Sequence, residues 1–512
     1  MTSNDRLESV DGPLTGDKLT YHYNTLGNLI DITPEQGQAV AYQYDYDTGI
    51  ADIDLGRLKS ITAGTSTFTY DYDGVNPLIQ KLTRPNGGYT DYQYNDPLKR
   101  LTALINKAST GTLINSFAYT YHKDLIKTET ITNGTIIDNF LEKTTTYQPN
   151  AVNQLVSATT APNPAKVYAY DNDGNMTTGY TPADIALTMT YDAQNRMKTA
   201  QYTDGTGKVN LFEYAYAGTS LLDQLVKKEN GTPVSTTKYL RSGFLPIQER
   251  DGSNAITREY TWGKNLGGGI GGLLNLKQSG QDYSYLYDGK GNVSALINST
   301  QQVVASYAYD PFGMLMKDTS LQGFDQPYKF STKPYFSGMG QSDFGYRYYD
   351  ACSGKWTTRD PLEEEGGLNL YQFNNNSAMN WIDPTGLVPL DTIWDLGNVI
   401  YDAITGDWES LAWDTGALFI PYVPAGVTKI KNIGKLGRVT KMCKAESKIW
   451  KNLDNFRDDI KTSGSGKNKR YYKWDHTHGD IEVYDHNRKH LGSIDPITGV
   501  STKPAKHPKL EL

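Results

Sequence analysis

One short motif recurs through most of this chain and constrains its fold more than any other feature. Tyr-Xaa-Tyr-Asp, followed by Gly or Asn, occurs with small variations at Tyr42, Tyr70, Tyr92, Tyr168, Tyr191, Tyr285 and Tyr307. Alternate residues of a strand point to one face, and Asp-Gly or Gly-Asn supplies a tight turn. The repetition predicts a winding β-sheet built hairpin on hairpin, with Tyr rings stacked on one side. We expect these tyrosines to be scaffold residues.

The composition fits this picture and excludes several classes of protein. With 512 residues, 38 Tyr and 49 Gly, the chain is long enough for two or three domains of turn-rich β structure. Cys352 and Cys443 are too few and too far apart for a disulfide framework or a thiolate zinc site. The first residues lack the apolar segment of a signal peptide. The longest apolar run, residues 417–427, is too short to cross a bilayer. We therefore expect no stable membrane span.

The charge is divided unevenly along the chain. Residues 429–512 contain 19 Lys and Arg against ten Asp and Glu, a net of +9, so the rest must carry −16 for the total to be −7. Five of the seven His also lie in the last 37 residues. A basic segment on an acidic body favours an anionic partner, nucleic acid before membrane, and imidazoles transfer protons near neutral pH. The pattern predicts a large scaffold carrying a small reactive domain.

The Tyr-rich repeats resemble the YD/Rhs repeat family, and residues 285–387 resemble its Rhs-associated core. The likeness is carried by YDPFG from Tyr309, DFGYRYYDACSGKWTTRDPL from Asp343, and GLNLYQFNNNSAMNWIDPTGL ending at Leu387. The chain departs from the family at Ala351, where Pro is usual, and at Ser377-Ala378, where Asn-Pro is more common. The resemblance implies a spiral β-sheet shell around a toxic C-terminal segment.

The same resemblance implies that Asp360 and Asp383 face each other and cut the chain after Leu387. Two carboxylates that share a proton can activate water with one member and protonate or polarise the amide with the other. The residues alone do not establish this, because Asp-Pro is a common turn former. Cleavage would give fragments of 387 and 125 residues.

Residues 388–440 resemble the pre-toxin connectors of polymorphic toxins. Helical periodicity over residues 394–411 predicts a helical connector that ends at the Pro-rich turn 421–424. The expected architecture is mainly β. It comprises YD/Rhs repeats over 1–284, the core with its cleavage site over 285–387, the connector over 388–440, and a small antiparallel toxin domain over 441–512.

The C-terminal block fits a three-stranded antiparallel sheet over residues 470–474, 480–484 and 489–494. On the middle strand one face is shared by His478, Asp480, Glu482 and Tyr484. Asp475 can lie across the turn from Asp480. His490 joins this face only if the second hairpin has an odd register, which the sequence does not fix.

This grouping suits cleavage of RNA without a metal. A carboxylate removes the 2′-OH proton, the oxygen attacks the adjacent phosphate, and an imidazolium protonates the departing 5′-oxygen. A cation must stabilise the charge that develops on the phosphate. From spacing alone, a hairpin surface with assorted polar residues is an equally good interpretation.

The block also resembles the cytotoxic domain of the colicin/cloacin ribosomal ribonucleases. The likeness lies in Tyr-Lys-Trp-Asp ending at Asp475, His-Gly-Asp-Ile-Glu from His478, and His-Leu-Gly-Ser-Ile from His490. It places Asp475, His478 and Glu482 on the family's catalytic residues, with Glu482 as base, His478 as acid and Asp475 orienting the imidazole. Supporting or RNA-binding roles then fall to Asp480, Tyr484, His490, Lys503, Lys506 and Lys509.

The resemblance implies ribosomal RNA as substrate, a cognate immunity protein as partner, and no metal or cofactor. The family also uses an Arg near its C-terminus. Here that region offers only Lys503, Lys506, Lys509 and His507, and Lys lacks the planar fork of Arg. The chain is expected to be secreted or delivered by a secretion system, and its toxin domain to act in the cytoplasm of a target cell.

Two alternatives stay open. One is a metal-dependent nuclease with ligands among His476, His478, Asp480 and His490, since imidazole and carboxylate suit divalent ions. Against it, no HExxH motif is present. The other is a non-enzymatic shell or surface adhesin whose Tyr-rich sheet binds carbohydrate or protein, which would require exposed aromatic side chains.

Overall fold

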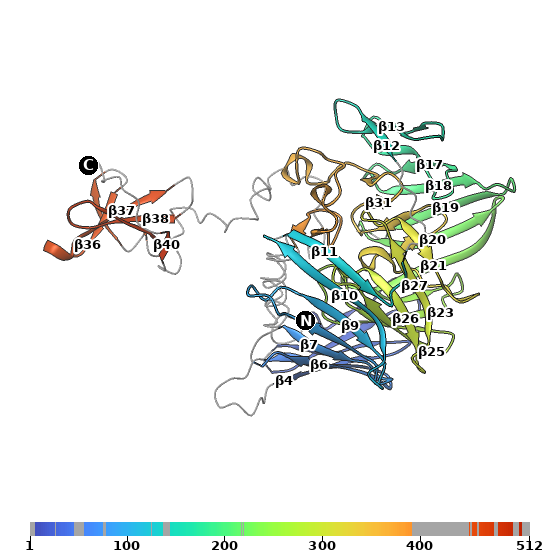
Figure 1. Cartoon of the computed structure of the whole chain (residues 1–512), viewed down its shortest axis with the longest axis horizontal. Helices are drawn as coiled ribbons and strands as arrows, with labels where there is room; N and C mark the ends of the chain where they lie inside the picture. Colours follow the sequence, from blue (N-terminus) through green and yellow to red (C-terminus); the bar gives the residue numbers. More distant parts are fainter. Residues whose placement is uncertain are drawn as a thin grey trace. The chain divides into compact units, whose positions relative to one another are not determined.

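The structure is a computed structural model, and the expected mainly β architecture is confirmed (Figure 1). It describes residues 6–25, 27–45, 56–74, 78–123, 125–136, 144–216, 218, 220–391, 450, 453–457, 460–475, 480–494 and 501–503. The chain divides into two compact units, Met1–Lys429 and Ile430–Leu512. The predicted helical connector, apart from residues 388–391, lies outside the described residues.

The first unit begins with an 11-stranded antiparallel sheet in which every strand pairs with its neighbours in sequence. Its strands are β1 (Ser9–Val10), β2 (Leu19–Tyr23), β3 (Leu29–Pro34), β4 (Val40–Asp45), β5 (Arg57–Ala63), β6 (Ser66–Tyr72), β7 (Ile79–Thr83), β8 (Tyr89–Gln93), β9 (Ala103–Lys107), β10 (Leu113–His122) and β11 (Leu125–Thr132). A three-stranded sheet follows, made of β12 (Thr145–Pro149), β13 (Leu155–Thr160) and β14 (Lys166–Val167).

A second long sheet has 14 strands, again in sequence order. They are β15 (Ala169–Tyr170), β16 (Met176–Tyr180), β17 (Ala186–Tyr191), β18 (Met197–Thr203), β19 (Val209–Tyr216), β20 (Leu222–Glu229), β21 (Thr232–Ser242), β22 (Leu245–Arg250), β23 (Ile256–Trp262), β24 (Leu273–Gln278), β25 (Gln281–Tyr287), β26 (Val293–Asn298), β27 (Val303–Tyr309) and β28 (Leu315–Asp318). This order is what a chain of hairpins produces.

A tyrosine near the end of several hairpin strands has a repeated structural task. A β-bulge in the pairing with the following strand comes directly before it. Its hydroxyl donates, at 2.6–2.9 Å, to a carbonyl near the start of the preceding strand. The pairs are Tyr44 to Leu29, Tyr72 to Leu58, Tyr121 to Leu101, Tyr191 to Met176, Tyr216 to Met197, Tyr287 to Leu273 and Tyr309 to Val293. The bond satisfies a carbonyl where the ladder ends.

The two long sheets are joined by buried polar contacts. Arg84 Nη2 donates to the Tyr285 carbonyl at 3.2 Å, and Asn115 Nδ2 donates to Ser294 Oγ at 3.2 Å. Farther along, Gln248 Nε2 donates to the Gln36 carbonyl at 2.6 Å. Strands distant in sequence therefore pack against each other through side chains that are themselves hydrogen-bonded, as buried polar groups must be.

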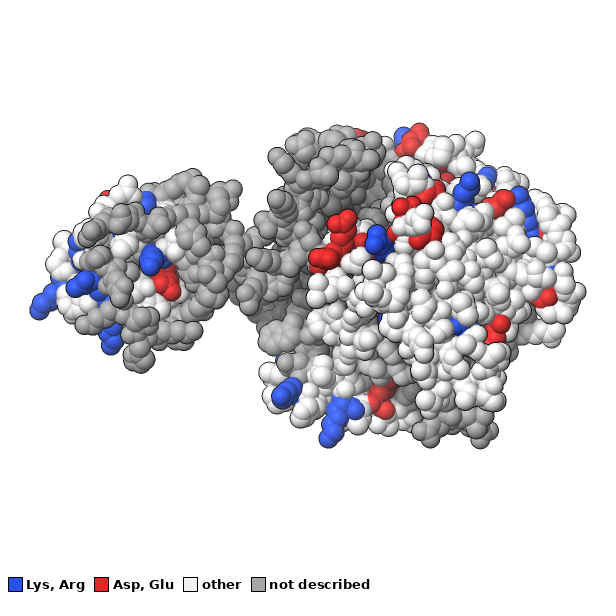
Figure 2. All heavy atoms as spheres, turned by 90° about the horizontal axis from the view of Figure 1, so that it is seen from above, with Lys and Arg blue, Asp and Glu red and all other residues white. Residues whose placement is uncertain are grey.

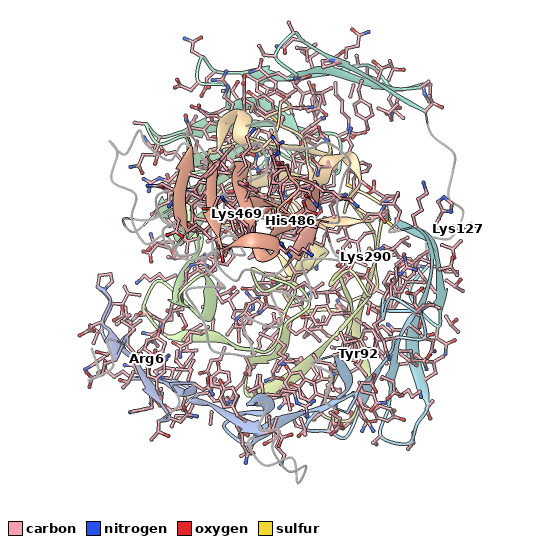
Figure 3. All side chains as sticks on the ribbon, turned by 90° about the vertical axis from the view of Figure 1, so that its left-hand side faces the viewer. Arg6, Tyr92, Lys127, Lys290, Lys469 and His486 are labelled. Carbon is pink, nitrogen blue, oxygen red and sulfur yellow. The ribbon has the colours of Figure 1, made fainter. Side chains whose placement is uncertain are left out.

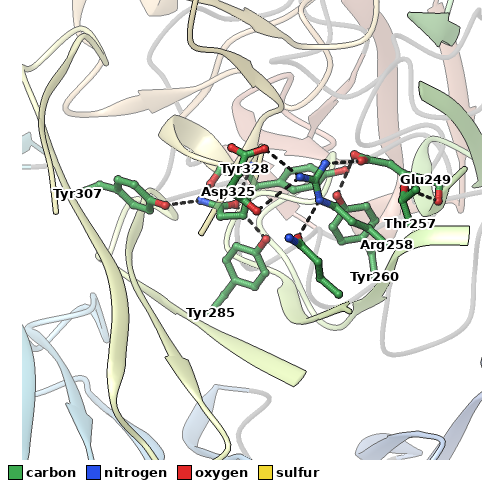
Figure 4. Close-up of polar contacts among 10 residues, drawn as sticks. Glu249, Thr257, Arg258, Tyr260, Tyr285, Tyr307, Asp325 and Tyr328 are labelled. Carbon is green, nitrogen blue, oxygen red and sulfur yellow. Dashed lines mark hydrogen bonds and ion pairs between the residues drawn. The ribbon is translucent and has the colours of Figure 1, made fainter. Parts of the chain in front are cut away.

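Several tyrosines of the second sheet make buried polar contacts (Figure 4). Tyr260 donates its hydroxyl to Glu249 Oε1 at 2.8 Å, and Arg258 pairs with Glu249 Oε2 at 2.7 Å. Tyr285 and Tyr307 both contact Gln326, at 3.0 and 2.9 Å. These rings are buried and internally bonded, which agrees with the scaffold role expected of them.

The described part of this unit ends in short strands and turns around an aromatic core. It contains β29 (Tyr335–Phe336), β30 (Gln341–Asp343), β31 (Tyr348–Asp350), β32 (Lys355–Trp356), β33 (Trp381–Ile382) and β34 (Leu390–Asp391), with short 3₁₀ turns η1 (Phe330–Thr332), η2 (Glu363–Glu365) and η3 (Asn374–Asn376). The core includes Phe344, Tyr349, Trp356 and Phe373, and the rings of Tyr349 and Phe373 stack at 3.9 Å.

In its described residues, the second unit forms a six-stranded antiparallel sheet. Its strands are β35 (Asp454–Arg457), β36 (Ile460–Ser463), β37 (Arg470–Asp475), β38 (Asp480–Tyr484), β39 (His490–Ile494) and β40 (Ser501–Lys503), and η5 (Gly466–Asn468) precedes β37. The three expected strands correspond to β37–β39, but three further strands extend the sheet, so the predicted size was wrong. Trp450, Trp474 and Ile481 form a core against one of its faces.

No helix within the described part of the chain is long and apolar enough to cross a membrane.

Candidate functional site

The first candidate site is one face of the C-terminal sheet. In the β37–β38 hairpin, directly paired positions share a face. These pairs are Tyr471 with Tyr484, Lys473 with Glu482, and Asp475 with Asp480. The positions of the two expected acids at residues 475 and 480 therefore face each other across the hairpin.

The next two strands add to the same face. Glu482 pairs with Ser493, and a bulge after Val483 brings His490 opposite Tyr484. Ser493 in turn pairs with Lys503 on β40. The bulge supplies the odd register that His490 needs to join the face, which the sequence left open.

Glu482 and Tyr484 are in direct contact on this face. The Tyr484 hydroxyl donates to Glu482 Oε2 at 2.5 Å. The Tyr484 ring lies 5.0 Å from the ring of buried His490, and it packs with Ile460 and Tyr471. A half-buried carboxylate held by a phenol beside an imidazole is able to accept a proton from a bound hydroxyl.

The other predicted site residues of this domain are less fully described. For Asp475, Asp480 and Lys503 the structure gives the backbone position only. His478, Lys506 and Lys509 lie outside the described residues, as does His476 of the metal-binding alternative.

One exposed lysine lies on this face, and further exposed basic residues lie at one end of the sheet. Lys473, paired with Glu482, is exposed, and so are Lys467, Arg488 and Lys489. Blue Lys and Arg spheres are scattered over this unit in Figure 2. Lys469 precedes β37 and His486 lies in the β38–β39 turn, so both belong to one end of the sheet (Figure 3). Such a surface can attract phosphate.

The second candidate site is the Asp383–Leu387 loop between β33 and β34. Asp383 Oδ1 accepts from the backbone N–H groups of Thr385, Gly386 and Leu387 at 3.1, 2.7 and 3.1 Å. Asp383 Oδ2 is buried and has no hydrogen-bond partner among the described residues. One oxygen of this carboxylate therefore holds the loop, and the other is available to an additional group.

Arg347 connects this loop to the second predicted acid. Its Nη1 lies 2.9 Å from Asp360 Oδ2, and its Nη2 lies 3.7 Å from Asp383 Oδ2. It also donates through Nε to the Gly386 carbonyl and through Nη2 to the Leu387 carbonyl, the latter at 3.3 Å. Both predicted acids thus form ion pairs with the guanidinium of Arg347, which also donates to the carbonyl of Leu387, the expected cleavage position.

Burial alters the proton affinity of these groups. It raises the pKa of Asp360; Arg347 opposes this change and the nearby charge of Asp383 adds to it. Burial also lowers the pKa of Arg347, against the effect of both acids. A raised pKa makes it easier to keep Asp360 protonated, which suits a proton donor.

Sequence reasoning missed Arg347 and Lys333, whose Nζ donates to the Pro384 carbonyl at 2.5 Å. Arg347 lay within a motif already recognised, Gly-Tyr-Arg-Tyr-Tyr-Asp, so an Arg placed between aromatic residues could have drawn attention to it. For Lys333 the sequence offered no comparable signal.

Two family models match parts of the chain. Residues 268–379 match the Teneurin YD-shell model, and residues 458–510 match the model described as Cytotoxic. The second match contains the Glu482 face, and the first contains Arg347 and Asp360.

Curated relatives match over a greater length. The tRNA3(Ser)-specific nuclease WapA of Bacillus spizizenii is 25% identical over 435 residues, covering 75% of this chain and 18% of the relative. The tRNA nuclease WapA of Bacillus subtilis strain 168 is 24% identical over 417 residues, covering 72% of this chain and 17% of the relative. The chain thus spans less than a fifth of the length of these relatives.

Among solved structures, the Tc holotoxin pore of Photorhabdus luminescens is similar to this fold. Its TM-score is 0.53 at 17% identity, over 73% of this chain and 21% of that chain. This likeness supports the fold. The chain is therefore similar to a YD-shell over residues 268–379, to the Cytotoxic model over residues 458–510, and to proteins named WapA nucleases over about three quarters of its length.

Proposed function

We propose that this chain is a toxin whose C-terminal domain cleaves RNA by metal-independent acid–base transesterification. Glu482 acts as the base that removes the 2′-OH proton, His478 acts as the acid for the 5′-oxygen, and Asp475 orients the imidazole. The observation that carries the proposal is the Glu482–Tyr484 contact on a face lined by paired acidic and basic positions. Each proton-transfer partner is expected to contribute about 10²–10⁴-fold to the rate.

Asp480, Tyr484, His490 and the lysines Lys503, Lys506 and Lys509 are proposed to support the site or bind RNA. Exposed Lys473 is added to them, because it pairs with Glu482 across the hairpin. Lysines would neutralise phosphate charge in place of the Arg that the ribonuclease family uses. No cofactor is required for this chemistry.

The substrate proposed is ribosomal RNA, which follows from the resemblance of residues 470–499 to ribosomal ribonucleases and agrees with the Cytotoxic match over 458–510. Transfer RNA is the second candidate, because the curated relatives are named tRNA nucleases. Purified chain, incubated separately with ribosomes and with total tRNA, would separate the two. Sequencing of the new RNA ends identifies the cleaved nucleotide.

The decisive comparison uses the wild type, Glu482→Gln and a wild-type sample with EDTA. Glu482→Gln keeps the side-chain volume but removes the base. We expect it to lose at least about 10²-fold in RNA cleavage, and EDTA to leave the wild type active. Loss of activity in EDTA would favour the metal-dependent alternative. A wild type that cleaves neither RNA would favour the adhesin.

We also propose that the chain cleaves itself after Leu387. Asp383 Oδ2 takes a proton from water as that water attacks the Leu387 carbonyl carbon. Arg347 Nη2 stabilises the charge that forms on the carbonyl oxygen. Protonated Asp360 then donates to the departing nitrogen of Val388, and the bond between Leu387 and Val388 breaks.

The support for this step is the convergence of both acids and the Leu387 carbonyl on Arg347. Intact-mass analysis should find fragments covering residues 1–387 and 388–512. Asp383→Asn should leave the chain whole; if it were cut at the same bond, the proposal would be wrong.

In this proposal the β scaffold of residues 1–387 encloses the ribonuclease until release, and a cognate immunity protein protects the producing cell. The chain would be secreted or carried by a secretion system and would act in the cytoplasm of the target cell. The proposed domain limits are 1–284, 285–387, 388–440 and 441–512.

A further inference from the structure

Lys333 is a buried cation whose hydrogen bonds, within the described part of the chain, go to backbone carbonyls. Its side chain belongs to a residue that is 2% exposed. Its Nζ donates to the Pro384 carbonyl at 2.5 Å and to the Gly268 carbonyl at 2.7 Å. The rings of Phe244 and Phe344 lie 5.2 and 5.4 Å away. Placing an ammonium in such surroundings is costly, so its position requires an explanation.

The Gly268 side of this contact is a tight glycine loop between β23 and β24. Gly268 has φ +54, and a Cβ on it would lie 1.8 Å from the Pro384 carbonyl oxygen. The loop is held to the segment before Lys333 as well, since Gly271 N donates to Thr332 Oγ1 at 2.8 Å. The backbone of residues 267–271, the glycine loop, therefore lies very close to the Asp383–Leu387 loop, here called the cleavage loop. Only Gly fits at position 268.

Every carbonyl from Pro384 to Leu387 accepts a hydrogen bond. Tyr346 N donates to the Thr385 carbonyl at 3.1 Å, and Arg347 donates to those of Gly386 and Leu387. Lys333 supplies the bond to Pro384. Among these donors, Lys333 also donates to the Gly268 carbonyl in the glycine loop. It therefore joins the cleavage loop to the loop between β23 and β24 of the 14-stranded sheet.

We propose that Lys333 is a positioning residue for self-cleavage, because it fixes the Pro384 carbonyl to the glycine loop and so places the Leu387 bond on Arg347 and the two acids. This inference rests on the self-cleavage proposed above. On this proposal, the cleavage loop reaches its reactive position only after residues 267–271 have packed against it. The chain is therefore cut after the 14-stranded sheet has formed. A displacement of about 1 Å at a reacting bond can cost about 10²-fold in rate.

The test follows cleavage of newly made full-length chain. Labelled chain is synthesised in a cell-free reaction, synthesis is stopped, and the appearance of the 1–387 and 388–512 fragments is timed. Lys333→Met, which removes the ammonium at similar length, and Gly268→Ala should each slow cleavage by about 10²-fold. Lys333→Arg should retain much of the rate.

Matched controls separate positioning from general destabilisation. Lys329→Met removes another buried lysine, whose Nζ faces Asp318 at 3.6 Å and the Tyr307 ring at 4.1 Å. Gly280→Ala places a Cβ at φ +74 with nothing within 4 Å. Both controls should cleave at close to the wild-type rate.

The pH profile gives a readout that a purely structural role would not change. Burial lowers the pKa of Lys333 to about 7; Asp383 and Asp343 oppose this change, and Arg241 adds to it. The wild-type rate should therefore fall as the pH rises through about 7, when the ammonium loses its charge. In Lys333→Arg, which stays charged, this fall should be smaller, and the part that remains would come from Asp360, the proposed proton donor.

The outcomes distinguish the two proposals. If the wild type is not cut, or Asp383→Asn is cut like the wild type, self-cleavage itself is wrong. If the wild type is cut and Asp383→Asn is not, but Lys333→Met and Gly268→Ala match their controls, the role of Lys333 is wrong. A Lys333→Met chain that fails to fold leaves the decision to the Lys333→Arg pH profile, where an unchanged fall near pH 7 contradicts the inference.

Discussion

Arg347 forms a buried ion pair with Asp360, with 2.9 Å between Nη1 and Oδ2. The two residues are 2% and 7% exposed. A buried pair of this kind is weak evidence for stability, because the desolvation of both charges offsets much of their attraction. The role we assign to this ion pair is to position the guanidinium, which also donates to the Leu387 carbonyl.

The first prediction concerns that guanidinium. Arg347→Lys keeps the positive charge but cannot contact Asp360 and two carbonyls together. We expect self-cleavage to slow by about 10²–10³-fold, the cost of removing one donor to a developing oxyanion. The measurement is the rate of fragment formation by intact mass. Arg359→Lys is the matched control, and an Arg347→Lys rate equal to it would contradict the prediction.

The second prediction concerns the phenol beside Glu482. The Tyr484 hydroxyl donates to Glu482 Oε2 at 2.5 Å, and this bond fixes the position of the proposed base. Tyr484→Phe removes the bond and should slow RNA cleavage by up to about 10²-fold, because a small displacement of a reacting group is costly. The rate is measured at one pH on folded protein. Tyr471→Phe, on the paired position, serves as control. Equal rates in the two variants would show that the Tyr484 hydroxyl does not position Glu482.

The third prediction tests the structural role of the repeated tyrosines. Tyr287→Phe removes the 2.6 Å bond to the Leu273 carbonyl and leaves a buried acceptor unsatisfied. We expect it to lower the free energy of unfolding by about 1–3 kcal/mol in urea. Tyr168→Phe is the matched control, because the Tyr168 hydroxyl is buried without a hydrogen-bond partner in the described part of the chain. Equal losses in the two variants would contradict the assigned role.

The fourth prediction concerns Asp350. Burial raises the pKa of this carboxyl to about 6, although Ser353 and the Cys352 N–H oppose the change. A raised pKa means that the folded state favours the protonated form. This contribution is complete below about pH 4, the unfolded value, and is lost as the pH rises through about 6.

A pKa that rises from 3.8 to about 6 on folding corresponds to about 3 kcal/mol at most. Urea unfolding between pH 4 and 7 should therefore show stability falling with pH in the wild type. The fall should be smaller in Asp350→Asn, which cannot ionise. Asp204→Asn, at an exposed turn, should keep the wild-type dependence. An equal fall in Asp350→Asn would remove Asp350 as its cause.

Much of the fold could be predicted from the repeated motif. Tyr-Xaa-Tyr-Asp with a Gly or Asn turn predicted hairpins in sequence order, and both long sheets have that order. The bulge before Tyr287 and its bond to Leu273 could not be predicted, because they depend on how two strands are aligned. The number of strands in the C-terminal sheet was also missed, since β35, β36 and β40 carry no recognisable motif.

The candidate sites, like the fold, could be predicted from the sequence only in part. Parity along one strand placed Glu482 and Tyr484 on a common face, since side chains alternate along any extended chain. The position of His490 on that face depended on a bulge after Val483, and only the paired strands reveal it.

By itself, then, the sequence determined the strand periodicity, the turns, the excess of basic residues at the C-terminal end and the acids worth considering. The tertiary structure decided that Arg347 joins Asp360, Asp383 and the Leu387 carbonyl, and that Lys333 bonds Pro384 to Gly268. The physical reason is the separation in sequence between the residues that interact. Periodicity and turns follow from the geometry of a few neighbouring residues, whereas these contacts join segments that only the packing of the whole unit brings together.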